Sequence, residues 1–342
     1  MASNSIIDAH IHLWPKNMAD EAGHSWMTLG MPLAKEHVLA DYYQASPQGH
    51  VDGVVYVETD VRYAKPSGAV SEWAKNPLDE IRFLRNVVEG GYGERDSKML
   101  KAIVAWAPMD QPPVVLEEWL RLAEEAAGQE TWRRVKGFRF LLQSIHDEKK
   151  FVDVVSGSNF INNLKTLGRR GFSFDVGVDQ QSGGVWQLEA FAKCMSASHQ
   201  GVPEGSKVVF ILNHLCKPEF QKDGAGYVRW RRAIESMSRC STAYMKLSGA
   251  FSELPQAMGG TTNIAHHLKP WVSHVFACFS ASRVMFGSDW PVCNLKGPRQ
   301  EDSWVCWKDV VEFVLDDSEY HFTDQDRERV WKGTAMEAYQ LE

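Results

Sequence analysis

The amino-acid sequence predicts a single α/β domain, a (β/α)8 barrel of the TIM type that extends over residues 1–342. Two observations lead to this prediction. Short apolar runs alternate with longer amphipathic segments along the whole chain, and eight of each are found, which is the number that a closed barrel requires. No linker rich in Pro, Gly or Ser and no internal repeat divides the chain, so one domain is expected.

The runs expected to form strands are mostly apolar throughout, instead of alternating between apolar and polar residues. This pattern is typical of parallel strands that are buried on both faces of their sheet. The runs occupy residues 6–11, 53–58, 102–107, 136–141, 172–176, 207–212, 243–247 and 283–286.

Amphipathic helices are expected between the strands, because apolar residues recur there at steps of three and four. They occupy residues 77–89, 114–127, 160–170, 186–198, 228–239, 271–279, 303–315 and 323–340. Thr323 is a candidate N-cap of the last helix, with Asp326 three residues later. The segment 15–36 is too long for an ordinary strand–helix connection, and we expect it to fold over the mouth of the barrel.

The composition restricts the partners and the location. A net charge of −7 without clustered basic residues argues against nucleic acid or an anionic membrane as a partner. The six cysteines lie far apart, without a Cys-x-x-Cys pair, as is typical of free thiols in a reducing compartment. No apolar stretch reaches membrane-spanning length and no secretory leader pattern is visible, so a cytoplasmic location is expected.

Candidate metal ligands and a candidate base lie at the ends of the first and last strands. His10 and His12 are two residues apart, so both imidazoles can face the barrel interior and form a partial metal site. A pair of core or surface histidines is the alternative interpretation. Asp289 directly follows the last strand, at the end where barrel enzymes carry their catalytic residues. Its carboxylate can bind a metal or take a proton from water.

Other polar residues follow further strands, and we expect them at the same rim. They are Glu58, Asp60, Arg139, Gln143, Asp175, Asn213, His214, Lys217 and Ser248, with Trp106 and Trp290 as aromatic neighbours. An unpaired charge in a barrel core costs several kcal/mol, so these groups should pair with one another, a metal or a polar ligand. A mutual ion pair of Asp175 with Arg139 is one interpretation, and Trp106 is either a core residue or part of the pocket floor.

Taken in order along the chain, these motifs resemble the amidohydrolase superfamily. The resemblance lies in His10 and His12 and in the runs 136–139, 174–175, 213–218, 246–249 and 286–291. More narrowly it points to the sugar-lactonase branch, and the runs 57–60 and 77–84 are most similar to fungal L-rhamnono-γ-lactonases. Asp175 stands where many metal-dependent members have a histidine, which argues against a binuclear centre. Asn213 stands where relatives often have an aspartate.

The resemblance implies a hydrolase that opens a small sugar-acid lactone, an aldonolactone such as L-rhamnono-γ-lactone, by attack of activated water on the ring carbonyl. One divalent cation, with Zn²⁺ as the first expectation, is then held by His10, His12 and Asp289, with Glu58 as a further ligand. Asp289 or His214 transfers the proton, and Lys217 stabilises the oxyanion. The substrate-binding residues are Arg139, Gln143, Glu58, Asn213, Trp106, Ser248 and Trp290.

Three alternatives remain open from the sequence. Some lactonases of this branch need no metal, and in that version His10, His12, Lys217 and Arg139 donate hydrogen bonds to the carbonyl while Asp289 is the base for free water. A metal-dependent decarboxylase of the same superfamily is the second alternative. The third is a non-catalytic barrel that binds a small molecule. A homodimer is a further expectation from the resemblance.

Overall fold

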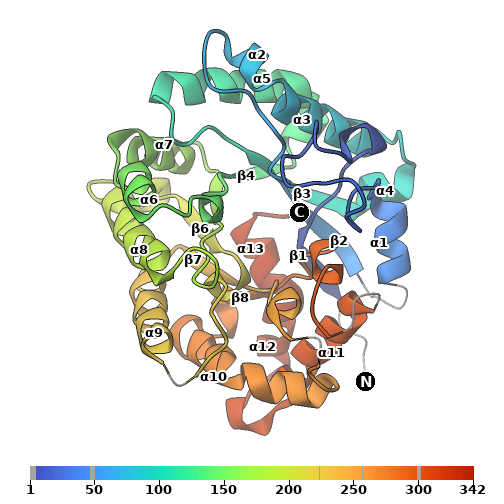
Figure 1. Ribbon diagram of the computed structural model, residues 1–342, viewed down its shortest axis with the longest axis vertical. Helices are drawn as coiled ribbons and strands as arrows, with labels where there is room; N and C mark the ends of the chain where they lie inside the picture. The colour runs from blue at the N-terminus through green and yellow to red at the C-terminus, as the bar shows by residue number, and fades with distance from the viewer. Residues whose placement is uncertain (1–4, 47–50, 223, 256, 299–301) are drawn as a thin grey trace.

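The computed structural model describes residues 5–46, 51–222, 224–255, 257–298 and 302–342, and it confirms the predicted barrel. Eight strands follow one another around a single sheet in the order β1 to β8, and helices pack around the outside (Figure 1). Every strand pairs in parallel with the next strand of the chain. Their carboxyl ends therefore meet at one rim, as the candidate site requires.

The strands are short and almost completely buried, as expected for a barrel wall covered on both sides. They are β1 (Ile6–Ile11), β2 (Val51–Val57), β3 (Leu100–Trp106), β4 (Val135–Arg139), β5 (Ser173–Val176), β6 (Val209–Leu212), β7 (Ala243–Leu247) and β8 (Val284–Phe286). The barrel closes just beyond β8, where the Asp289 N–H donates to the His10 carbonyl at 2.9 Å and the His12 N–H donates to the Trp290 carbonyl at 2.8 Å. This seam joins segments from the two ends of the sequence.

The helices cover the strands in the expected alternation. They are α1 (Leu39–Ala45), α2 (Val70–Trp73), α3 (Lys75–Val88), α4 (Glu94–Met99), α5 (Pro113–Trp132), α6 (Glu148–Val155), α7 (Ser158–Arg169), α8 (Val185–His199), α9 (Ala225–Ser238), α10 (Thr261–Phe279), α11 (Ser303–Asp316), α12 (Asp324–Glu328) and α13 (Thr334–Ala338). Helices α1, α2, α4 and α6 were not predicted, because four to eight residues hold too few turns to show a period. Within the described residues, none of the helices combines the length and the apolar character needed to cross a bilayer.

The last predicted helix is divided in the structure. A π-helical turn, Arg329–Gly333, separates α12 from α13. Thr323 caps α12 as predicted: its hydroxyl accepts the Asp326 N–H at 3.2 Å, and the Asp326 carboxylate accepts the Thr323 N–H at 2.9 Å. The wider turn takes up an extra residue, and buried positions run on from this turn into α13, so an apolar period alone did not reveal the break.

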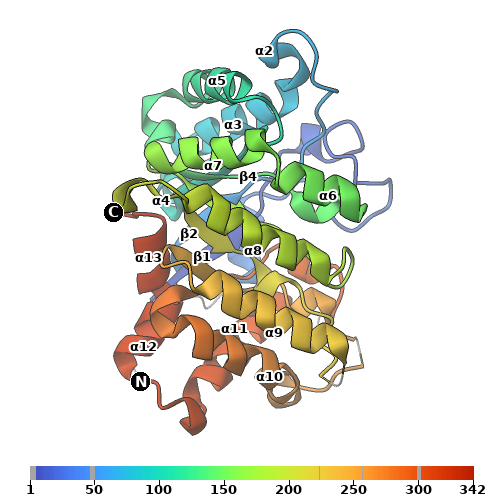
Figure 2. The same cartoon turned by 90° about the vertical axis from the view of Figure 1, so that its left-hand side faces the viewer.

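Apolar side chains form two layers of core. The larger layer lies between the strands and the surrounding helices. The smaller one joins strand side chains such as Ile7 and Val104 to Ala335 and Tyr339 of the C-terminal segment. In Figure 2 the C-terminus lies on the side away from the loop that follows β1. The C-terminal segment therefore packs under the barrel, where the strands begin, and the other end is left for the site.

The segment between β1 and α1 lies over the mouth, as predicted. Trp14 forms an antiparallel bridge with His37, which ties the start of this loop to its end. Trp14, Met27 and Leu33 form a small apolar core of their own. That core packs against Leu295, which lies beyond β8, so the loop is held to the segment that follows Asp289.

Candidate active site

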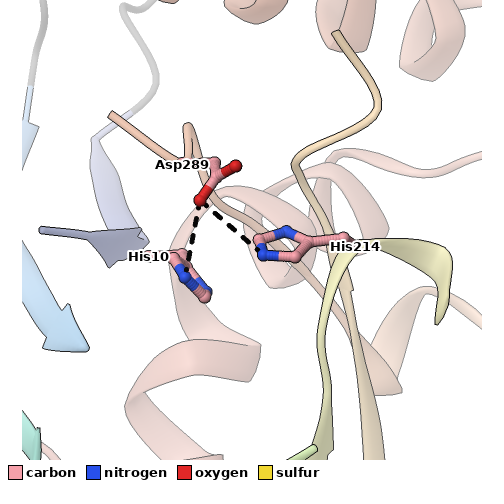
Figure 3. A group of neighbouring side chains, drawn as sticks. All are labelled: His10, His214 and Asp289. Atoms are coloured by element: carbon pink, nitrogen blue, oxygen red, sulfur yellow. Dashed lines mark ion pairs between the residues drawn. The ribbon is translucent and has the colours of Figure 1, made fainter. Parts of the chain in front are cut away.

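Four buried side chains from strand ends converge on one point at the carboxyl rim. The Asp289 Oδ1 atom lies 3.6 Å from His10 Nε2, 3.4 Å from His12 Nε2 and 3.7 Å from His214 Nε2. Figure 3 shows His10 and His214 approaching the same carboxylate oxygen from different strands. The side chains predicted from the two ends of the sequence therefore share one site.

A buried aspartate on β1 fixes the loop that carries Asp289. The Ser288 N–H donates to Asp8 Oδ1 at 2.8 Å. The other oxygen of Asp8 accepts the Tyr42 hydroxyl at 2.9 Å and the Trp304 indole N–H at 3.0 Å. Asp8 is wholly buried, and together with the His10 N–H, 3.3 Å from Oδ1, these donors take the place of water around its carboxylate. Asp8 thus fixes the backbone next to Asp289 and with it the direction of the Asp289 side chain.

The Ser–Gly motif after β7 positions His214. The Ser248 hydroxyl lies 2.8 Å from His214 Nδ1. Gly249 has a φ of +61°, and a Cβ atom there would lie 2.3 Å from the same nitrogen. Only glycine fits this backbone and this close approach. Ser248 was predicted to bind substrate, but it acts through His214 and does not line the cavity.

The two histidines of β1 are held by different partners at Nδ1. His12 Nδ1 lies 2.8 Å from the Val57 carbonyl oxygen. His10 Nδ1 lies 3.1 Å from Nζ of Lys246, which in turn pairs with Asp175 at 2.6 Å. The interpretation of Asp175 and Arg139 as a mutual ion pair is therefore wrong, since each has another partner. The signal for Lys246 was a lysine inside an otherwise apolar strand, because such a lysine needs a buried partner.

The site opens into a cavity of about 420 Å³ at the mouth of the barrel. Predicted site residues that line it are His12, Arg139, Gln143, His214, Lys217 and Asp289, and the loop after β1 contributes Trp14, Trp26 and Leu33. The wall thus combines polar groups near the strand ends with apolar groups on the loop. Such a surface suits a small polar molecule that also has an apolar face.

Two cations of the cavity wall have carboxylate partners. Lys217 Nζ lies 3.2 Å from Glu253 Oε1, and Arg139 forms a buried ion pair with Glu58. Glu58 also accepts the Asp60 N–H at 2.6 Å. Both oxygens of Glu58 are therefore occupied, which corrects its prediction as a metal ligand. It does not line the cavity and acts instead by orienting Arg139.

The surroundings of Asp289, His214 and Lys217 determine which of these side chains are charged at neutral pH. Burial would raise the pKa of Asp289, but His214, His12 and Lys217 outweigh it and hold the pKa below its ordinary value. Burial lowers the pKa of His214 to about 3, although Asp289 opposes the shift. Burial would lower the pKa of Lys217, but Glu253 and other carboxylates raise it. At neutral pH the site therefore presents a carboxylate, a neutral imidazole and an ammonium group.

Three other predicted substrate-binding residues lie behind the cavity wall. Trp106 packs against Tyr63 and Trp119, with ring centroids 4.6 and 5.1 Å apart, and belongs to the core. Trp290 packs against Tyr42 at 5.5 Å. Asn213 is buried, and its side-chain amide has no hydrogen-bond partner in the described part of the chain. These three side chains point away from the cavity, and the sequence does not reveal the direction of a side chain at a strand end.

Several cavity residues were not assigned to the site from the sequence. They are Thr59, Ser144, His146, Asp179, Ser182, Glu253, Val292, Leu295 and Lys296. Most lie some residues beyond a strand end, in loops whose course the sequence does not fix. Asp60, which was expected at this rim, also lines the cavity, and burial, together with the charge of Glu58, raises its pKa to about 7.

The spacing of the ligand atoms suits a divalent cation. His10, His214 and Asp289 offer one nitrogen or oxygen each, all within 4.8 Å of one another. In a tetrahedral zinc site with bonds of about 2.0–2.1 Å, neighbouring ligand atoms lie about 3.3 Å apart. The distances from Asp289 to the three imidazoles, 3.4–3.7 Å, are close to that value. His214 joins the predicted ligands, whereas Glu58 does not.

Comparison with known proteins gives matches along nearly the whole chain. Residues 7–341 match the protein family described as Amidohydrolase. An L-rhamnono-gamma-lactonase of Scheffersomyces stipitis is 29% identical over 100% of both chains. An L-fucono-1,5-lactonase of Burkholderia multivorans is 26% identical over 98% of this chain and 96% of the other. The crystal structure of a Burkholderia multivorans amidohydrolase with bound Zn has a TM-score of 0.73 at 23% identity, covering 98% of this chain and 99% of that one.

Proposed function

This chain belongs to the amidohydrolase family, and from that premise we propose that it is a lactonase that hydrolyses a small sugar-acid lactone, an aldonolactone such as L-rhamnono-γ-lactone. The observation that carries the proposal is the meeting of Asp289, His12, His214 and Lys217 at one cavity on the carboxyl rim. The two curated relatives named as sugar lactonases, which match nearly the full length, support the substrate class.

The reaction begins with water held at the base of the cavity. The Asp289 carboxylate takes a proton from this water as its oxygen attacks the lactone carbonyl carbon. The carbonyl oxygen gains negative charge, and the Lys217 ammonium, 3.2 Å from Glu253, stabilises it. Arg139, oriented by Glu58, also lines the cavity and binds the substrate.

Collapse of this tetrahedral species opens the ring. The bond between the carbonyl carbon and the ring oxygen breaks, and the ring oxygen receives the proton that Asp289 holds, which gives the open hydroxy acid. His214 is the alternative carrier: its neutral ring can accept this proton at Nε2, which makes the ring transiently cationic, and then donate it to the ring oxygen. Gln143 and the carboxylates of Asp60 and Asp179 also line the cavity, and we assign them to the binding of sugar hydroxyls.

We propose that a divalent cation, Zn²⁺, is held by His10, His214 and Asp289, whose ligand atoms lie within 4.8 Å of one another, and by His12, which lies 3.4 Å from Asp289. When bound there, such a cation supplies Lewis-acid polarisation of an oxygen and lowers the pKa of water. The relative crystallised with bound Zn supports this proposal. We also propose cytoplasmic action, which the free cysteines support, and a homodimer, which rests on the resemblance alone.

A panel of aldonolactones, followed by the acid that hydrolysis releases with a pH indicator, tests the proposed function. We expect turnover of one or more sugar lactones by metal-loaded protein and release of acid without gas. Release of CO₂ from a carboxylated substrate would instead favour a decarboxylase of the same family. No turnover of any lactone, with or without added Zn²⁺, would contradict the proposal.

A further inference from the structure

The hydrogen bonds behind His10 and His12 decide which protons face the site. We propose that Lys246 holds His10 in the tautomer that carries its proton on Nε2, and that this weakens metal binding. Lys246 is thus a positioning residue that acts through His10. The inference rests on the metal site of the proposed function, but not on the identity of the substrate.

The protonation of His12 follows from its backbone partner. His12 Nδ1 lies 2.8 Å from the carbonyl oxygen of Val57. A carbonyl can only accept a hydrogen bond, so Nδ1 of His12 must carry the proton. A neutral imidazole has one ring proton, and Nε2 of His12 therefore presents a lone pair to the site.

The partner of His10 has the opposite character. Nζ of Lys246 lies 3.1 Å from His10 Nδ1, and an ammonium group has only donors. Lys246 is wholly buried and forms an ion pair with Asp175 at 2.6 Å. Asp175 also accepts the Tyr339 hydroxyl at 3.0 Å. With Lys246 donating to Nδ1, neutral His10 must carry its proton on Nε2.

The two assignments agree at the point where the rings meet. His10 Nε2 and His12 Nε2 are 3.2 Å apart, which is hydrogen-bond distance for a donor facing an acceptor. The Nε2–H of His10 then donates to the lone pair of His12. With the other tautomer of His10, two lone pairs would face each other at this distance. The four groups thus form one directed chain from Lys246 through His10 and His12 to the Val57 carbonyl.

This series of hydrogen bonds disfavours the binding of a cation between His10 and His12. A metal needs lone pairs, but His10 directs a proton into the site and the lone pair of His12 accepts that proton. Binding through His10 requires its proton to leave Nε2, and the contact with Lys246 then has no acceptor. The distances between the ligand atoms suit a metal ion, whereas the proton on His10 Nε2 does not. Removing Lys246 should therefore strengthen binding, although loss of a buried partner normally weakens a site.

Zinc affinity of purified variants tests the inference. K246M/D175N removes the donor together with its carboxylate partner, so that no unpaired buried charge is left. Y339F is the matched control, because it removes the other donor to Asp175 without touching His10. Competition against a chromogenic chelator should give a zinc Kd that is roughly tenfold lower for K246M/D175N than for wild type and is unchanged for Y339F. Equal or weaker binding by K246M/D175N with native circular dichroism would overturn the inference.

The tautomer itself gives a second readout that needs neither metal nor activity. In ¹⁵N-histidine NMR of zinc-free wild type, with the His10 signals assigned by their loss in H10N, we expect the Nε2–H form. The Nδ1–H form would overturn the inference even if K246M/D175N failed to fold. Absence of zinc binding by every variant would refute the proposed metal site, and the tautomer of His10 would then decide the inference by itself.

Discussion

Asp289 keeps its charge in a buried place because its neighbours are suited to a carboxylate. Three imidazole nitrogens lie within 3.7 Å of its Oδ1 atom, and Lys217 adds a positive charge. Among the described residues that converge with His10 and His214, Asp289 is the only carboxylate, so it is the group that can accept a proton from the attacking water. At the scale of single residues, the rate should therefore depend on Asp289 more than on any other side chain.

Substitution D289N tests this dependence. An amide has nearly the same shape but cannot serve as a base, so kcat should fall by about 10²–10⁴-fold. The measurement is acid release from the preferred lactone, with zinc content and melting temperature recorded for each protein. The substitution D317N, at a partly exposed ion pair with Lys269, serves as the control and should leave kcat unchanged. A D289N enzyme with more than about a tenth of the wild-type kcat would rule out the assigned role.

At the scale of elements, the buried pair of Glu58 and Arg139 joins the end of β2 to the end of β4. Neither side chain is exposed by more than 6%, so the pair is nearly without water. R139M leaves Glu58 unpaired, and breaking a buried pair in this way costs about 3–5 kcal/mol of unfolding free energy. R139M/E58Q should recover much of that loss, because no charge is left without a partner. Urea unfolding of the three proteins checks both statements, and equal stability of R139M and wild type would contradict them.

The loop after β1 has a stability that depends on pH. His37 lies between Trp14 and Trp290, with ring centroids 4.9 and 5.4 Å away, and neither ring nitrogen has a hydrogen-bond partner among the described residues. Burial lowers its pKa from 6.5 to about 4. The neutral ring thus contributes stability that is complete above pH 6.5 and is lost as the pH falls towards 4, because the unfolded chain takes up a proton that folded His37 does not.

Substitution H37F isolates this contribution. Phenylalanine fills the same space and cannot be protonated, so the stability of H37F relative to wild type should increase by about 1–2 kcal/mol between about pH 7.5 and about pH 5. Urea unfolding of both proteins at the two pH values measures the difference. A difference that stays constant with pH would show that His37 titrates normally in the folded protein.

At the scale of the whole molecule, a cation that binds only the folded chain should stabilise the barrel. Zinc at about 100 times its Kd should add about 2.7 kcal/mol to the unfolding free energy. Thermal unfolding with zinc and with excess chelator measures this effect, and H12A should abolish it because His12 Nε2 lies 3.4 Å from Asp289. An unchanged melting temperature of wild type in zinc would contradict a folded-state site.

The sequence predicted the barrel well because its evidence is repeated along the chain. Each strand is a buried apolar run and each long helix shows a period, so one misplaced boundary does not alter the architecture. The strands of the structure lie within or close to the predicted runs, although strand 2 begins at Val51, two residues before its predicted start. Polar residues at strand ends were found in the same way, since the carboxyl ends of parallel strands meet at one rim.

The details of the site depend on distances that no local pattern contains. Trp106 and Trp290 were placed at the correct end of the barrel but on the wrong side of its wall. Glu58 was expected to bind a metal, yet its carboxylate pairs with Arg139, which lies 81 residues later on another strand. Asp179 and Glu253 reach the cavity from loops. The location in the cytoplasm and the homodimer stay predictions.

Because the seam between β8 and β1 joins the two ends of the chain, we expect the site to assemble late in folding. The Asp289 N–H donates a hydrogen bond to the His10 carbonyl across that seam, although almost the entire sequence separates the two residues. A folding intermediate that lacked only this last pairing would have most of its helices and strands but no catalytic centre. Recovery of enzymatic turnover, followed against recovery of circular dichroism during refolding, would therefore time the moment at which the circle of strands is completed.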